Sequence, residues 1–219
     1  MDFGFQNDSG TALTDIHPVL KTSLTGPWPL PHEVLYVAMG CFWGVERIFW
    51  SQPGVINTAV GYLGGHWPHP TYEDVCTGQT GHAETTRIVY DPTRTSAGDL
   101  LKVFWENHDP TQGERQGNDR GSQYRSMIVY TTAQQRQLAE QSRKSFGKTL
   151  AQAGRGPITT EILSLAAAGE FWLAEPYHQA YLFHHPHGYC NHGFKGFVCE
   201  APRLTNLTAL AFQSRHAGF

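Results

Sequence analysis

Cys41 lies between two glycines and beside two large aromatic residues, in the stretch GCFWG from Gly40 to Gly44. Residues 34–39 before it form a short apolar run typical of a buried strand. Apolar residues after it recur at helical spacing, which places Cys41 at the first turn of a helix. Unpaired backbone N–H groups and the helix dipole stabilise negative charge there. We therefore expect the pKa of this thiol to fall from about 8.5 into the range of a nucleophilic thiolate.

Four more polar residues could assist a thiolate: Glu84 in TGHAE, Asp119 in GND, and the tyrosines Tyr72 and Tyr124. Cys41, Glu84 and the two tyrosines each have a simpler interpretation. A free cysteine is often a core residue, a carboxylate at the start of a strand is often solvated, and a tyrosine often packs with a satisfied hydroxyl. For Cys41 the helix start and the flanking glycines, which keep bulk away from the sulfur, favour the nucleophile.

The elements that would position these residues follow from hydrophobic periodicity. Strands are predicted over residues 34–39, 55–62, 83–90 and 124–130, with one helix after the first strand and another after the third. Ser96 and Asp99 resemble a capping box at the start of the second helix. Strand, helix, strand, strand, helix, strand is the split βαβ order of ferredoxin-like α+β folds. The sequence therefore predicts a single mixed sheet with helices packed on one face. The two helix-bearing strands would lie side by side at its centre, so distant segments can meet near Cys41.

The remaining segments complete one domain with appendages. The pattern predicts a short helical turn capped by Thr71, a polar loop over 108–122, a long helix over 131–153, strands over 158–163 and 171–174, and a short helix over 176–183. A loop-rich C-terminal tail follows. Residues 1–33 are read as an N-terminal arm lying on the surface. We expect a single catalytic domain over 34–203, tail included, and a C-terminal extension over 204–219.

Composition excludes several classes of protein. The 16 basic and 19 acidic residues give a net charge of −3 without long runs of like charge, which argues against a nucleic-acid partner. No apolar run reaches the length of a membrane span, and the N-terminus lacks a secretory signal pattern. Four cysteines in a chain that is 40% hydrophobic are not needed as disulfide staples. We expect a cytoplasmic monomer with reduced thiols and no metal or other cofactor.

Five separated motifs carry a resemblance to a known family. They are GCFWG at 40–44, TGHAE at 80–84, GND at 117–119 with QYRS at 123–126, YHQ at 177–179 and GYC at 188–190. In this order and at similar spacing they resemble the peptide methionine sulfoxide reductase A family, over residues from about 34 to about 203. The resemblance implies thiol-dependent reduction of the S epimer of methionine sulfoxide, free or in proteins, to methionine, as a repair of oxidative damage.

The resemblance also implies roles for individual residues. A sulfoxide sulfur is a poor electrophile until its oxygen is protonated or strongly hydrogen-bonded, so the site needs an acid as well as a thiolate. Cys41 matches the nucleophile, and Glu84 matches the carboxyl that donates the proton, which burial would keep protonated near neutral pH. The other matches are Tyr72 and Tyr124 as hydroxyls holding the oxygen, Asp119 as a polar residue near the nucleophile, and Phe42 and Trp43 as an aromatic wall for the S-methyl group.

The same resemblance implies how the enzyme is regenerated. Loss of methionine leaves Cys41 as a sulfenic acid, which condenses readily with a second thiol. Cys190, in a glycine-containing tail expected to be flexible, matches that thiol. Cys199 would then exchange with Cys190 and pass the disulfide to a thioredoxin-like reductant. Cys76 matches a cysteine without a necessary role and is assigned to packing.

Three other classes of function remain open from the residues alone. A metal module could use His184, His185, His187, Cys190, His192 and Cys199, although their spacing fits neither of the usual zinc-ligand patterns. A cysteine hydrolase or acyltransferase could pair Cys41 with His82 as base, which would leave the C-terminal thiols without purpose. A non-enzymatic scaffold would make Phe42, Trp43 and the two glycines accidental.

Overall fold

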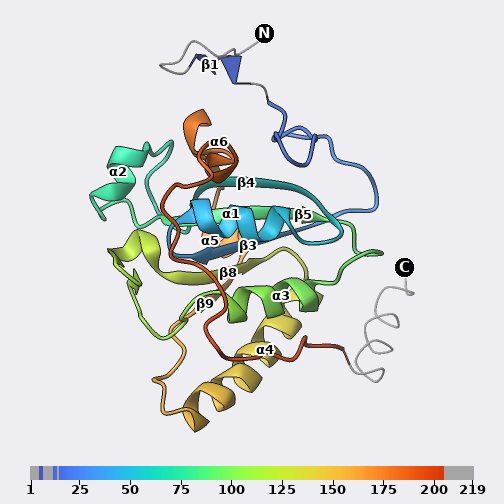
Figure 1. Ribbon diagram of the computed structural model, residues 1–219, viewed down its shortest axis with the longest axis vertical. Coiled ribbons are helices and arrows are strands. Elements are labelled where there is room, and N and C mark those ends of the chain that lie inside the picture. The colour runs from blue at the N-terminus through green and yellow to red at the C-terminus, as the bar shows by residue number, and fades with distance from the viewer. Residues whose placement is uncertain (1–4, 7–11, 14, 205–219) are drawn as a thin grey trace.

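The computed structural model describes residues 5–6, 12–13 and 15–204, and its centre is a six-stranded sheet in the order β10-β4-β5-β3-β8-β9 (Figure 1). Its strands are β3 (Glu33–Met39), β4 (Val55–Leu63), β5 (Ala83–Tyr90), β8 (Ser126–Tyr130), β9 (Glu161–Ser164) and β10 (Trp172–Leu173). Two short hairpins lie outside this sheet: β1 (Phe5–Gln6) with β2 (Ala12–Leu13), and β6 (Arg115–Gln116) with β7 (Asp119–Arg120).

The strand pairing is that of the predicted ferredoxin-like core. β3 pairs antiparallel with both β5 and β8, and β4 pairs antiparallel with β5. β8 and β9 run parallel, so the sheet is mixed, as predicted. The two strands that lead into helices, β3 and β5, lie side by side at the centre. Because they are antiparallel, the end of β3 at Met39 lies next to the beginning of β5 at Ala83.

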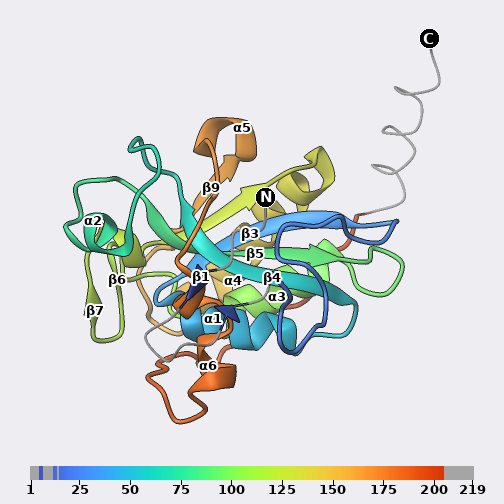
Figure 2. The same cartoon turned by 90° about the horizontal axis from the view of Figure 1, so that it is seen from above.

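Helices cover the sheet mainly on one face. They are α1 (Phe42–Trp50), α2 (Tyr72–Cys76), α3 (Ala97–Glu106), α4 (Ala133–Gln152), α5 (Leu165–Ala168) and α6 (Tyr181–His184), with 3-10 turns η1 (Ser122–Tyr124) and η2 (Pro176–His178). Apolar side chains of α1, α3 and α4 pack on Leu35, Val37 and Met39 of β3. Figure 2 shows the one-turn α5 on the opposite side of the sheet, where Ala168 packs with Tyr36 and Ala38. No helix in the described part of the chain is long and apolar enough to cross a membrane.

Helix starts agree with their sequence signals. Ser96 and Asp99 form the predicted capping box of α3, in which the Ser96 hydroxyl accepts from the Asp99 N–H at 3.1 Å. Thr71 caps α2 in the same way. An N-cap side chain of this kind satisfies a backbone N–H that would otherwise lack a partner, and is worth about 1 kcal/mol. The short helix α2, which carries Tyr72, therefore begins at a fixed residue.

Three segments differ from their predicted structure. The loop predicted over 108–122 contains the β6-β7 hairpin, and Tyr124 ends a 3-10 turn instead of beginning β8. The strand predicted from 158 begins only at Glu161. The helix predicted over 176–183 is split into η2 and α6, because Ala180 adopts a left-handed backbone with φ of 51°. At the split, Gln179 bonds to both the N–H and the C=O of Val60 in β4.

The chain before β3 packs on the sheet in its described part. The imidazole of His17 is fully buried, where Nε2 lies 2.9 Å from the Thr58 hydroxyl and 3.5 Å from Glu46 Oε1. Trp28 lies under the Arg87 guanidinium, whose carbon is 4.7 Å from the ring centroid. The division into an arm, a catalytic domain and an extension stays a prediction, and the extension lies outside the described residues apart from Leu204.

Candidate active site

Cys41 occupies the predicted junction between β3 and α1. It is the N-cap residue of α1, and its side chain is 8% exposed. Gly40 before it has φ of 98°, a conformation that favours glycine, and a Cβ there would come within 2.6 Å of the Gln116 side chain. The glycine therefore allows both the turn that presents Cys41 and the close approach of the β6-β7 hairpin.

Glu84 reaches the same helix start from the neighbouring strand. It is the second residue of β5, it is 2% exposed, and its Oε2 accepts a hydrogen bond from the Phe42 N–H at 3.0 Å. Burial raises the pKa of this carboxyl to about 8, against the opposing effect of the Phe42 N–H. The carboxyl is therefore mainly protonated at neutral pH, which is the form that an acid must have.

The predicted lowering of the Cys41 pKa is wrong. Burial is the largest effect, the nearby Glu84 carboxyl adds to it, and together they raise the pKa of the thiol despite a hydrogen bond with the Trp43 backbone. Here the free-energy cost of removing a thiolate from water is larger than the stabilisation that the helix start gives it. The resting site therefore holds a thiol beside a protonated carboxyl, and the thiol must lose its proton during the reaction.

The two tyrosines lie around this pair. Tyr72 is the first residue of α2 and Tyr124 the last of η1. Burial is the main cause of the raised pKa of each phenol, and the charge of Glu84 contributes to both. Both hydroxyls are therefore neutral hydrogen-bond donors close to the Glu84 carboxyl.

Asp119, the first residue of β7, lies close enough to Cys41 for its charge to act on the thiol, and the tail holds its carboxylate. Its carboxylate accepts from the Tyr189 hydroxyl at 3.1 Å and from the Asn191 amide at 2.8 Å. Burial raises the pKa of Asp119 in spite of these two bonds, and its charge is one of those that raise the pKa of Cys41. The predicted position of Asp119 near the nucleophile therefore agrees with the structure, whereas its two tail partners were not predicted.

Phe42 and Trp43 form an aromatic group with residues from the end of the chain. Phe42 is 1% exposed, and the Trp43 indole stacks on Tyr181 with ring centroids 3.7 Å apart. The indole N–H donates to His178 Nδ1 at 3.0 Å, and the His178 ring also contacts Phe42 and Tyr72. Burial lowers the pKa of His178 to about 4, so the imidazole is neutral and packs as an aromatic ring.

Glu175 is a further residue of the site that the sequence analysis did not single out. Its Oε2 accepts from the Tyr62 hydroxyl at 2.8 Å, and its Oε1 accepts from the Tyr72 N–H at 2.7 Å. It thereby fixes the start of α2 against β4. The motif YHQ at 177–179 was a signal for this region, but no sequence pattern indicated which backbone group Glu175 would bind.

The four cysteines are free thiols. Cys190 lies against the backbone of Gly44, and its charge contributes to the raised pKa of Cys41. Cys199 is not brought to the site: it is 2% exposed in the core beside α3, and its N–H donates to Glu106 Oε1 at 2.8 Å. Burial raises the pKa of Cys199 to about 11.

The assignment of Cys76 to packing is wrong, because Cys76 is exposed at the end of α2.

The alternative sites do not form. His82 Nε2 lies 2.8 Å from the Trp67 carbonyl and Nδ1 accepts from the Gly65 N–H at 3.1 Å, so neither nitrogen is free to serve Cys41. In the part of the chain that the structure describes, no three His, Cys, Asp or Glu residues are grouped as metal ligands. Within the histidine-rich segment, His185 packs on the Tyr181 ring and His192 bonds to the Met39 carbonyl.

Comparison with known proteins agrees with this geometry. Residues 33–203 match the family model described as peptide methionine sulfoxide reductase. The chain is 56% identical over 191 residues to the peptide methionine sulfoxide reductase MsrA of Salinispora tropica, covering 86% of each chain. It is 54% identical over 191 residues to that of Salmonella arizonae, covering 87% of this chain and 88% of the relative.

Solved structures share the fold. Methionine sulfoxide reductase A of Corynebacterium diphtheriae matches with a TM-score of 0.74 and 47% identity, over 85% of this chain and 89% of that one. Mxr1 of Saccharomyces cerevisiae in reduced form matches with a TM-score of 0.66 and 28% identity, over 81% of this chain and 94% of that one. The chain therefore belongs to the peptide methionine sulfoxide reductase family.

Proposed function

We propose that this protein reduces the S epimer of methionine sulfoxide, free or within proteins, to methionine, and so repairs oxidised proteins. The observation that carries the proposal is the buried, protonated carboxyl of Glu84, bonded to the Phe42 N–H at the helix start that presents Cys41. An acid and a sulfur nucleophile in one water-poor site are what sulfoxide reduction requires.

The proton of Glu84 and the proton of Cys41 both take part. Glu84 donates its proton to the sulfoxide oxygen, which the hydroxyls of Tyr72 and Tyr124 also hold. Cys41 attacks the sulfur, and its own proton passes to the Glu84 carboxylate just formed. The hydroxyl then moves from the substrate sulfur to the Cys41 sulfur as the bond between the two sulfurs breaks, so methionine leaves and Cys41 becomes a sulfenic acid. Glu84 ends the step protonated, so the high pKa of the resting thiol is no obstacle.

The epimer is selected by the directions from which the sulfur is contacted. Phe42 and Trp43 offer an apolar wall for the methyl group, and the stack on Tyr181 with the bond to His178 holds that wall in place. Glu84 and the tyrosines receive the oxygen, and Cys41 approaches from a third direction. The sulfur of the R epimer is pyramidal with the opposite configuration. With the rest of the substrate directed to solvent, it cannot place its methyl group on the wall, its oxygen on Glu84 and the tyrosines, and its sulfur in front of Cys41 at the same time.

Regeneration uses the tail. Cys190 attacks the Cys41 sulfenic acid with loss of water, Cys199 exchanges with the resulting disulfide, and thioredoxin reduces the Cys190–Cys199 bond. Every redox step is carried by protein thiols, without a bound cofactor. We place this cycle in the reducing cytoplasm, on a monomer whose catalytic domain spans residues 34–203. The family match over residues 33–203 supports that boundary.

The proposal is tested with the purified protein, dithiothreitol and the separated sulfoxide epimers of a methionine peptide. We expect the S epimer to be reduced and the R epimer to remain. Cys41→Ser should abolish turnover, whereas Cys76→Ser, which changes the exposed thiol of α2, should keep it. Folded wild-type protein that reduces neither epimer, or only the R epimer, would refute the assignment.

A further inference from the structure

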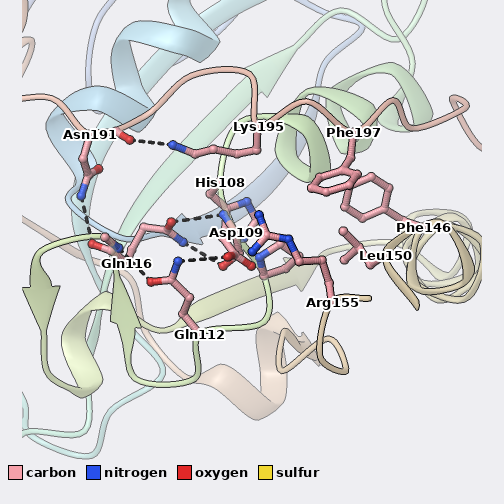
Figure 3. Close-up of a pocket in the computed structure, with 12 residues that line it drawn as sticks. His108, Asp109, Gln112, Gln116, Phe146, Leu150, Arg155, Asn191, Lys195 and Phe197 are labelled. Atoms are coloured by element: carbon pink, nitrogen blue, oxygen red, sulfur yellow. Dashed lines mark hydrogen bonds between the residues drawn. The ribbon is translucent and has the colours of Figure 1, made fainter. Parts of the chain in front are cut away.

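The C-terminal tail, residues 185–204, crosses a void between its two cysteines. Figure 3 shows Asn191, Lys195 and Phe197 of the tail around a cavity of about 160 Å³, with His108 and Arg155 among the residues opposite. The N–H groups of Gly193 and Lys195 donate backbone hydrogen bonds to the end of α3, and these bonds hold this stretch. Because side chains do not fill the space beneath it, hydrogen bonds made by residues on either side of Cys190 fix where this thiol lies.

His192 supplies one of these contacts. Its Nε2 lies 2.7 Å from the carbonyl oxygen of Met39, the last residue of β3. A carbonyl only accepts, so the ring proton is on Nε2 and His192 is the donor. Burial lowers the pKa of the imidazole to about 4, so the ring is neutral at neutral pH. Its Nδ1 has no hydrogen-bond partner among the described residues.

The His192 ring and the Cys190 thiol share one surface of α1. A Cβ added to Gly44 would come within 2.4 Å of His192 Nδ1 and 2.7 Å of Cys190 Sγ. Both groups therefore lie next to each other on the bare backbone of the first turn of α1, the turn that Cys41 caps. The second glycine of GCFWG thus makes room for the tail, in addition to keeping bulk from the nucleophile.

We propose that His192 is a positioning residue for the resolving step: its bond to the Met39 carbonyl holds Cys190 against Gly44, ready to meet Cys41. This inference rests on the proposed function. In the step, the Cys190 sulfur bonds to the Cys41 sulfur, the sulfur–oxygen bond of the sulfenic acid breaks, and the hydroxyl leaves with the Cys190 proton as water. The sulfenic acid is the oxidant, so no further redox partner is needed.

The test separates methionine formation from disulfide formation. Reduced protein is mixed with a methionine S-sulfoxide peptide and no reductant. Methionine is measured by rapid quench, sulfenic acid by dimedone labelling, and the Cys41–Cys190 bond by peptide mapping. For His192→Leu we expect methionine formation within about twofold of wild type and disulfide formation slowed by about tenfold or more, as expected when an intramolecular partner is no longer held in place. His187→Leu, which changes an exposed histidine of the same tail, should match wild type.

A conservative pair separates the donor from the shape of the ring. The amide nitrogen of His192→Gln can replace Nε2 and should restore disulfide formation, whereas that of His192→Asn ends too short and should not. Disulfide formation at the wild-type rate in the Leu and Asn variants would overturn the proposal. So would a parallel loss of methionine formation, which would make His192 a general structural support. Failure of wild type to form methionine would instead refute the proposed function.

Discussion

The Cys41 thiol and the Glu84 carboxyl are buried side by side at the start of α1, where the charge of one opposes the charge of the other. Burial is the main cause of the raised pKa at both groups, and the Glu84 charge adds to it at Cys41. The resting pair therefore holds both protons at neutral pH. A sulfoxide oxygen that takes the Glu84 proton leaves a carboxylate, which is the base that the thiol lacks. In the proposed mechanism, acid and base catalysis thus come from one side chain within one step.

Glu84→Gln tests this double role. Because the raised pKa of about 8 keeps Glu84 protonated below that pH, wild-type activity should fall as the pH rises through about 8. Glutamine preserves an acceptor for the Phe42 N–H but supplies no proton, so we expect a loss of roughly 100-fold at pH 7. The loss should lessen in acid, where solvent can protonate the sulfoxide.

The measurement is a pH profile of kcat/KM with dithiothreitol as reductant. Glu73→Gln, at an exposed carboxylate of the neighbouring α2, serves as the matched control and should keep the wild-type profile. A wild-type profile in Glu84→Gln would remove Glu84 from the chemistry.

Among the elements, those defined by local patterns were predictable. The four core strands, α1, α3 and α4 follow from apolar periodicity and caps, and their order determined the sheet topology. The split between η2 and α6 was not predictable, because it depends on Gln179 bonding to Val60, far away in the sequence. The lowered pKa expected for Cys41 failed for a related reason: a helix start is a local signal, whereas burial is produced by distant segments.

Gln179→Leu tests the long-range contact. Leucine has a similar size but leaves the buried N–H of Val60 without its partner, whereas the Val60 C=O keeps the Ala174 N–H as a donor. We expect the free energy of unfolding to fall by about 2 kcal/mol, since an unsatisfied buried backbone group costs about 1–3 kcal/mol. The neighbouring His178 would shift with it and loosen the aromatic wall, so KM for the sulfoxide should rise.

Urea unfolding and steady-state kinetics measure the two effects. Gln137→Leu, at an exposed position of α4, is the matched control and should change neither value appreciably. Unchanged stability in Gln179→Leu would show that its contacts with β4 do not hold this segment.

At the scale of the whole molecule, the tail connects the nucleophile to the far end of α3. The motif GYC indicated a resolving thiol at Cys190, and the structure places it against α1 near Cys41. The contacts that hold the tail, such as Asn191 with Asp119, join residues 72 positions apart and have no local signature. The tail was expected to be flexible, and it lacks helices and strands in its described part, yet it is fastened at these points. Cys199 is buried at the end of this path, so the proposed exchange with Cys190 requires the tail to leave α3.

The double variant Cys190→Ser with Cys199→Ser tests whether thioredoxin acts through the tail. Without either thiol, the Cys41 sulfenic acid stays in a buried site that a protein reductant cannot enter. We expect about one methionine per enzyme with thioredoxin, and continued turnover with dithiothreitol, which is small enough to reach Cys41. Cys199→Ser alone should stop at a Cys41–Cys190 disulfide, because the thiol that exchanges with this disulfide and forms the bond reduced by thioredoxin is missing. Product counts with each reductant measure this, with Cys76→Ser as the control. Sustained turnover of the double variant with thioredoxin would mean that the reductant reaches Cys41 directly, and the tail would then have to serve another purpose.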